Sequence, residues 1–209
     1  LFNKDITFLK THSALCTLEN NAFTNKINTK AAIYVVRDPR NVITSVSHHY
    51  SLNIKESFDF LNDTSRMLVN NKHGEIDYGC ATVLGSWSDH YKSWLNLKFA
   101  PIKVIKYEDL IFDTKNTLIS LLDFLSKFME INIDRRKIDN CIQSCSFEKL
   151  AQKEKKEGFS EAPTSRKDNK RLNFFHLGKK NNWKDLLSKE MEQKIREVFN
   201  KEMKLLDYC

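Results

Sequence analysis

The chain has 209 residues, of which 41% are hydrophobic and 29% charged, and it carries a formal net charge of +7 at pH 7. These fractions are typical of a soluble globular protein, and the length suits one domain with a sizeable core. No apolar run reaches the roughly 18 residues that a membrane span needs, and no signal-peptide cleavage pattern follows Leu1. The composition therefore excludes a membrane span, and the excess positive charge favours anionic partners such as nucleotides.

The cysteines are odd in number, widely spaced and without a CxxC pair, which argues against a disulfide framework or a structural zinc site. They are Cys16, Cys80, Cys141, Cys145 and Cys209. Catalytic zinc usually takes three protein ligands, and no HxxxH or HExxH spacing supplies them. We therefore expect a reduced, cytoplasmic protein without a bound metal.

Two segments have the pattern of β-strands and precede polar residues. Residues 5–9 alternate polar and apolar side chains and predict a short strand. Residues 31–36 form a continuous apolar run, typical of a strand covered on both faces in a parallel sheet. A further strand is predicted over residues 102–107.

Helical periodicity separates these strands. A helix is predicted to begin at Pro39 with Asp38 as its cap, and the last helix with Ser188 as its cap. Ser146 is expected to cap a short helix. Other predicted helices cover residues 56–71, 82–98, 114–127 and 134–143, and the last covers 188–206. The alternation of strands and helices predicts an α/β domain over residues 1–209 with a mostly parallel sheet.

Parallel sheets bind ligands beyond the carboxyl ends of their strands. We therefore expect His12, Arg37 and Tyr107, each at a predicted strand end, to meet in a common crevice. Arg37 and Ser45, near the start of the helix at Pro39, predict a phosphate clamp of guanidinium, hydroxyl and helix N-terminus. The alternative is a surface ion pair of Arg37 with a neighbouring carboxylate, with Ser45 merely packed.

Lys10 and His12 suggest group-transfer chemistry, because side chains two apart on a strand share a face. An imidazole can take a proton from a hydroxyl near neutral pH, and an ammonium can neutralise charge on a transferring group. The alternative is a partly buried histidine that bonds only to the backbone. His90, between Trp87 and Trp94, is expected to have a core or supporting role.

Residues 153–184 are polar, basic and poorly periodic, and predict a long loop. Its cations and aromatics leave three interpretations open: a single-stranded nucleic-acid surface, a lid over a nucleotide, or a solvated loop. These residues are Arg166, Lys167, Lys170, Arg171, Phe174, Phe175, Lys179, Lys180, Trp183 and Lys184.

Two segments, YVVRDPRNVITS at residues 34–45 and Lys10-Thr11-His12, belong to a set of motifs that resemble one known family. The family is the sulfotransferases that use 3′-phosphoadenosine 5′-phosphosulfate. The first segment resembles the family's 3′-phosphate-binding segment, and the second resembles its catalytic KTH. The other matching motifs are Gly85-Ser86-Trp87 with His90 and Trp94, Tyr107-Glu108-Asp109-Leu110, Ser144-Cys145-Ser146-Phe147, and Gly178 to Lys184. The motifs occur in the family's order across nearly the whole chain.

The resemblance implies a P-loop-NTPase-like three-layer α/β fold with a mostly parallel central sheet flanked by helices. It also implies in-line sulfonyl transfer to a hydroxyl or amine of a small-molecule or glycan acceptor, without metal or nucleic acid, in a protein that can be a homodimer. The implied catalytic residues are His12 as general base and Lys10 beside it. The implied donor-binding residues are Arg37 and Ser45 at the 3′-phosphate, Tyr107, Cys145 and Phe147 near the base, and Gly178 and Lys179 in the lid formed by residues 153–184.

The chain also departs from the family pattern. The family has an Arg-Lys pair before the loop glycine, where this chain has His176 and Leu177, and a glycine where this chain has Asn182. Nothing before Lys10 resembles the amino-terminal strand and loop that cradle the 5′-phosphosulfate, so we expect the 209 residues to transfer sulfonate poorly by themselves. A non-catalytic relative that binds a nucleotide or a partner is the alternative. The acceptor is not specified, and Trp87, Tyr91, Phe58 and Phe60 are candidates for an apolar lining.

Overall fold

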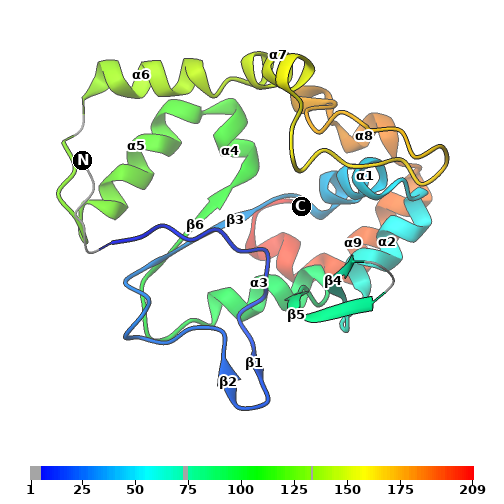
Figure 1. The fold of residues 1–209 in the computed structure, drawn as a ribbon, viewed down its shortest axis with the longest axis horizontal. Coiled ribbons are helices and arrows are strands. Elements are labelled where there is room, and N and C mark those ends of the chain that lie inside the picture. The colour runs from blue at the N-terminus through cyan, green and yellow to red at the C-terminus, as the bar shows by residue number, and fades with distance from the viewer. Residues whose placement is uncertain (1–5, 73–74, 133) are drawn as a thin grey trace. The chain divides into compact units, whose positions relative to one another are not determined.

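The structure is a computed structural model that describes residues 6–72, 75–132 and 134–209 (Figure 1). Its strands are β1 Thr17–Leu18, β2 Asn21–Ala22, β3 Ala32–Val36, β4 Met67–Lys72, β5 Glu75–Val83 and β6 Ile102–Lys106. Its helices are α1 Pro39–Tyr50, α2 Ile54–Asn62, α3 Trp87–Leu95, α4 Tyr107–Phe112, α5 Thr114–Leu125, α6 Arg135–Ser144, α7 Phe147–Glu157, the 3-10 helix η1 Gly178–Lys180, α8 Trp183–Leu186 and α9 Lys189–Leu205.

The chain forms two compact units, each built from separate stretches of sequence. The first unit comprises Leu1–Val36, Asp59–Ile105 and Asp123–Ile131. The second comprises Arg37–Phe58, Lys106–Leu122 and Asn132–Cys209. That residues 1–209 act as a single domain stays a prediction.

The strands β3 and β6 pair in parallel, as the α/β prediction requires. The expectation that β3 is covered on both faces is wrong, because Ile33 is 38% and Val35 50% exposed, whereas Val36 is buried. Alternate side chains of a strand point to opposite faces, and within the described residues only one face of β3 is well covered. An apolar run in the sequence does not distinguish a strand covered on both faces from one covered on a single face.

Three other sequence predictions fail locally. Residues 6–9 of the strand predicted at 5–9 are irregular, with Leu9 89% exposed, and Asp5 lies outside the described residues. A strand requires a neighbouring strand to hydrogen-bond with, and an alternating polar and apolar sequence pattern does not guarantee one. The helix predicted over 56–71 ends at Asn62, since β4 and β5 form an antiparallel hairpin that the helical pattern concealed. The helix predicted from residue 82 begins only at Trp87, because β5 runs to Val83.

The three helix caps predicted from the sequence, Asp38, Ser146 and Ser188, are confirmed. The side chain of Asp38 accepts the Arg40 N–H of α1, that of Ser146 the Lys149 N–H of α7, and that of Ser188 the Met191 N–H of α9. The strand predicted over 102–107 ends at Lys106, and Tyr107 instead begins α4, which the sequence analysis missed.

The second unit has its core along one face of α9. Ile195, Phe199 and Met203 recur every four residues, and each is at most 1% exposed. The helix α1 packs against both α9 and α8, and its Ile43 is fully buried (Figure 1). Each such side chain contributes about 1.5–3 kcal/mol by burial.

The first unit buries Trp94, whose indole N–H donates to the Ser13 carbonyl at 3.0 Å. The Ala14 N–H donates to the Val83 carbonyl at 2.7 Å. These bonds hold the backbone directly after His12. Across the described ranges, no helix combines the length and the apolarity that crossing a bilayer would take.

Candidate nucleotide-binding site

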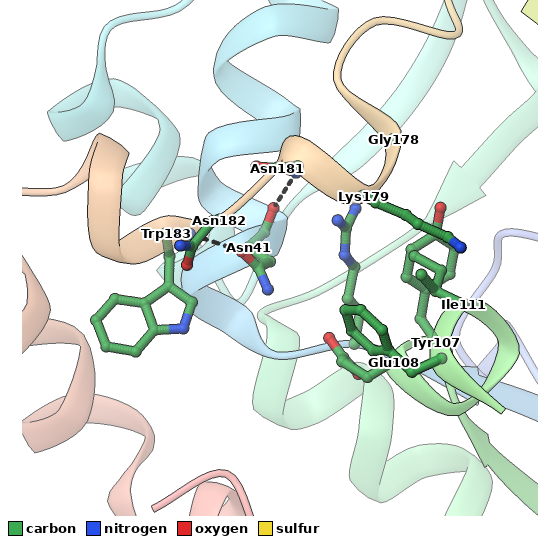
Figure 2. Close-up of a pocket in the computed structure, with 11 residues that line it drawn as sticks. Asn41, Tyr107, Glu108, Ile111, Gly178, Lys179, Asn181, Asn182 and Trp183 are labelled. Atoms are coloured by element: carbon green, nitrogen blue, oxygen red, sulfur yellow. Dashed lines mark hydrogen bonds between the residues drawn. The ribbon is translucent and has the colours of Figure 1, made fainter. Parts of the chain in front are cut away.

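A cavity of about 700 Å³ in the second unit is lined by all the residues predicted to bind the donor. These are Arg37, Ser45, Tyr107, Cys145, Phe147, Gly178 and Lys179. They come from the connection between β3 and α1, and from α1, α4, the α6–α7 junction and η1. A smaller cavity of about 330 Å³ shares Arg37, Tyr107, Gly178 and Lys179 with it (Figure 2). Their role in binding stays a prediction; their gathering around one cavity is observed.

Arg37 lies over the ring of Tyr107, with its guanidinium carbon 4.3 Å from the ring centroid. Burial lowers the pKa of Arg37, while Tyr107 and the nearby carboxylates act in the opposite direction; an arginine nevertheless stays protonated. Within the described part of the chain, the Nε of Arg37 is buried without a hydrogen-bond partner. A buried, unsatisfied cationic N–H is suited to receive an anion.

The carboxylate of Asp38 is occupied by another arginine. Arg40 donates to it through Nε at 2.9 Å and through Nη2 at 2.7 Å, and both side chains are buried. Arg40 also lies over the ring of Trp183 at 4.0 Å. Glu108, the other carboxylate near Arg37, accepts the Asp38 N–H at 3.2 Å and the Tyr208 hydroxyl at 3.0 Å. Both carboxylates thus have other partners than Arg37, which weakens the surface ion-pair interpretation.

Side-chain amides attach the segment around η1 to α1. The Thr44 hydroxyl donates to Asn181 Oδ1 at 2.6 Å, and Asn181 Nδ2 donates to the Asn41 carbonyl at 3.3 Å. The Trp183 N–H donates to Asn41 Oδ1 at 3.0 Å (Figure 2). These positioning residues were not predicted from the sequence, where the one signal was a polar Thr44 on the side of α1 that is buried. Asn182, in place of the family's glycine, has an extended backbone and caps α8.

Gly178 has a φ of +54° and lies against the ring of Phe147. A Cβ atom at this position would lie 2.8 Å from two ring carbons. The Phe147 ring also meets the Phe175 ring edge to face, with centroids 6.0 Å apart. Phe147 and Gly178 thus form one continuous part of the cavity wall.

The predicted loop 153–184 is shorter than expected. The helix α7 continues to Glu157, and residues 178–180 and 183–186 are helical. The carboxylate of Glu154, which is only 9% exposed, accepts the N–H groups of Phe174 and Phe175 at 2.6 and 3.0 Å. The rings of Phe174 and Phe175 meet Phe159 at 4.8 and 5.7 Å. These loop aromatics therefore pack on one another.

His12 and Lys10 are exposed residues of the first unit, and the same-face argument for them fails because they are not in a strand. The backbone at His12 is fixed by His90, whose Nε2 lies 3.1 Å from the His12 carbonyl. A carbonyl only accepts, so Nε2 carries the hydrogen and Nδ1 accepts from the Tyr34 hydroxyl at 2.9 Å. Burial is the largest cause that lowers the pKa of His90 below its ordinary value. His90 is thus a neutral supporting residue.

The structure bears on only part of the predicted common crevice of His12, Arg37 and Tyr107. Arg37 and Tyr107 lie together in the second unit, whereas His12 belongs to the first. Its place at the donor cavity stays a prediction. Among the acceptor-lining candidates, Phe58 is 3% exposed and packs near Phe199 in the core, whereas Trp87 stacks on Tyr91.

The fold matches a solved structure, "Crystal structure of mouse sulfotransferase SULT7A1 complexed with PAP", with a TM-score of 0.58 and 20% sequence identity. The match covers 85% of this chain and 59% of that one. The likeness confirms the predicted fold class, the P-loop-like α/β fold.

The chain belongs to the sulfotransferase domain family, which matches residues 3–207. It is 24% identical over 201 residues to sulfotransferase 1A1 of Rattus norvegicus, covering 96% of this chain and 64% of that protein. It is 25% identical over 205 residues to sulfotransferase 1B1 of Mus musculus, covering 96% and 63%. The chain thus spans slightly less than two thirds of the length of these relatives.

Proposed function

We propose that the protein is a sulfotransferase whose second unit binds 3′-phosphoadenosine 5′-phosphosulfate. The observation that carries the proposal is that Arg37 has a buried Nε without a partner among the described residues. Arg37 also lines one cavity together with Ser45 and Lys179. A guanidinium, a hydroxyl and an ammonium around one space suit a phosphate group. The solved relative in complex with PAP supports the same ligand class.

The donor-binding roles follow the chemistry of the cavity wall. Arg37 and Ser45 would hold the 3′-phosphate, and the rings of Tyr107 and Phe147, together with Cys145, would face the base. Gly178 and Lys179 would close the carboxy-terminal segment over the phosphate. When bound, the donor supplies an activated sulfonate that leaves adenosine 3′,5′-bisphosphate behind.

The transfer itself is assigned to Lys10 and His12. His12 would take the proton of an acceptor hydroxyl or amine, and Lys10 would neutralise charge on the transferring sulfonate. The acceptor is a small molecule or a glycan, and neither a metal nor a nucleic acid takes part. The packing of Phe174 and Phe175 on Phe159 supports a lid rather than a surface for stacking exposed bases.

A non-catalytic nucleotide-binding relative is the second candidate, favoured by His176 and Leu177 in place of the family's Arg-Lys pair. Sulfonate transfer from the donor to a panel of phenols, alcohols and amines separates the two. The assay uses the chain fused behind the amino-terminal phosphosulfate loop of a relative, because the 209 residues are expected to transfer sulfonate poorly by themselves. The enzyme is expected to show turnover in this fusion that His12→Ala lowers by about 10²–10⁴-fold, as for loss of a general base. Bisphosphate binding should remain unchanged in that variant. Binding without turnover in the fusion, and no further loss in His12→Ala, would favour the non-catalytic relative.

A further inference from the structure

The donor cavity contains a pair of stacked imidazoles that the predicted roles do not use. The rings of His48 and His176 lie 3.9 Å apart between centroids, with an angle of 5° between their planes. His48 lies three residues after Ser45 on α1, so the two side chains share a helix face. His176 lies two residues before Gly178. Both histidines line the same cavity as Arg37.

The tautomer of His48 follows from its contact with the backbone. Its Nε2 lies 2.9 Å from the carbonyl oxygen of Asn173. Since a carbonyl only accepts, Nε2 carries the hydrogen, and Nδ1 of the neutral ring has a lone pair. Protonation converts Nδ1 into a second N–H donor. His48 can therefore donate an N–H from Nδ1 to an anion only when the ring is charged.

The ionisable residues that line the cavity around the two histidines carry more positive than negative charge. Burial first, and then His48, lowers the pKa of His176. The other ionisable groups that line the cavity are Arg37 before α1, His49 and Tyr50 of α1, Tyr107 of α4, Cys145 before α7, Glu148 of α7 and Lys179 of η1. The permanent cations Arg37 and Lys179 oppose further positive charge, and Glu148 alone supplies a permanent negative charge. A bound phosphate reverses this balance, because an opposite charge within about 4–6 Å favours the charged form of a histidine.

We infer that the His48–His176 pair is a proton-coupled anion contact of the donor cavity. The pair takes up one proton as the phosphate-bearing nucleotide binds, and donates the new N–H to a phosphate oxygen. Uptake stops at one proton, because two unit charges about 4 Å apart repel each other by about 1–4 kcal/mol between bulk water and a protein surface. The inference rests on the proposed function, since that function supplies the nucleotide.

The consequence is that nucleotide affinity rises as the pH falls from about 8 to about 6.5, across the range in which histidine titrates. The nucleotide's own phosphate has its second pKa near about 6 and acts in the opposite direction. Subtracting the pH dependence of affinity measured for a variant without the imidazoles removes this contribution of the ligand. The double variant His48→Phe/His176→Phe keeps two flat rings but cannot take up a proton.

The test is calorimetric titration with adenosine 3′,5′-bisphosphate at pH 6.5 and pH 8.0, in two buffers of different ionisation enthalpy. Between pH 8.0 and pH 6.5, the affinity of the wild type is expected to rise by up to about tenfold more than the affinity of the double variant does. This factor corresponds to a pKa shift of about one unit. The wild type should also take up a fraction of a proton that the double variant does not. His176→Phe alone, at an exposed position, serves if the double variant does not fold.

Equal pH dependence and equal proton uptake in wild type and phenylalanine variants would overturn the inference and leave the proposed function standing. Absence of bisphosphate binding at both pH values would overturn the proposed function and the inference together. His176→Arg provides a fixed charge at the same place. It should bind at pH 8.0 as tightly as the wild type does at pH 6.5.

Discussion

Gly178 and Phe147 are in such close contact that a Cβ atom on Gly178 would lie 2.8 Å from the phenylalanine ring. The φ of +54° at Gly178 is also one that residues with a side chain rarely adopt. The relationship ties the backbone of η1, next to the donor cavity, to the first residue of α7. A change at Gly178 must therefore move either the backbone or the ring.

Gly178→Ala is expected to weaken the binding of adenosine 3′,5′-bisphosphate by about tenfold, from a strain of roughly 1–2 kcal/mol. Gly158→Ala is the matched control, because Gly158 also has a positive φ, of +76°, but has nothing within 4 Å of its would-be Cβ. Dissociation constants from titration calorimetry compare the two. Equal affinities in both variants would show that the contact with Phe147 does not matter.

Glu154 holds the segment before His176 through two backbone N–H groups. Glu154→Leu removes both bonds and is expected to lower the free energy of unfolding by about 3–6 kcal/mol, since hydrogen bonds to charged groups contribute about 1.5–3 kcal/mol each. Glu157→Leu removes an exposed carboxylate that lies 3.8 Å from Lys153 and should cost under about 1 kcal/mol. Urea unfolding measures both values. Similar losses in the two variants would contradict the assigned role.

Arg40 and Asp38 form a buried ion pair at the start of α1. Arg40→Met leaves the Asp38 carboxylate buried without its partner and should lower the free energy of unfolding by about 3–5 kcal/mol. Lys115→Met breaks the half-exposed pair with Asp139 and should cost about 1 kcal/mol or less. The double variant Arg40→Met/Asp38→Asn should recover part of the loss. No recovery would mean that the unpaired charge is not the cause.

The stability of the first unit should depend on the protonation of His90. The folded-state pKa of His90 is lowered from its ordinary value of 6.5, chiefly by burial. The unfolded chain therefore binds more protons, and the contribution of His90 to stability, present above about pH 6.5, is lost as the pH falls through the folded-state pKa. Urea unfolding at pH 7.5 and pH 5.5 should show a larger loss for the wild type than for His90→Gln. An equal loss in both would contradict the prediction.

The donor cavity was predictable from sequence because its chemistry sits at element boundaries. Arg37 follows an apolar strand, Ser45 lies on the helix that Asp38 caps, and Ser146 begins α7 next to Phe147. Such boundaries depend on local patterns and capping residues, which a single sequence contains. The whole set of predicted donor residues therefore lies around one cavity.

What the sequence did not reveal depends on contacts between distant residues. Asn41 and Thr44 form hydrogen bonds with a segment 137 to 142 positions away, and neither differs in type from a surface residue. Glu154 reads as one charge among many on α7, yet it is buried. The irregular backbone over residues 6–9 and the β4–β5 hairpin likewise depend on which strand finds a partner.

The most direct test is titration of the protein with adenosine 3′,5′-bisphosphate, together with Arg37→Ala and the exposed-lysine control Lys201→Ala. We predict saturable binding at one site, weakened about ten- to hundredfold by Arg37→Ala, since a charged hydrogen bond contributes about 1.5–3 kcal/mol, and unchanged by Lys201→Ala. Absence of saturable binding, or equal affinity in Arg37→Ala, would contradict the account.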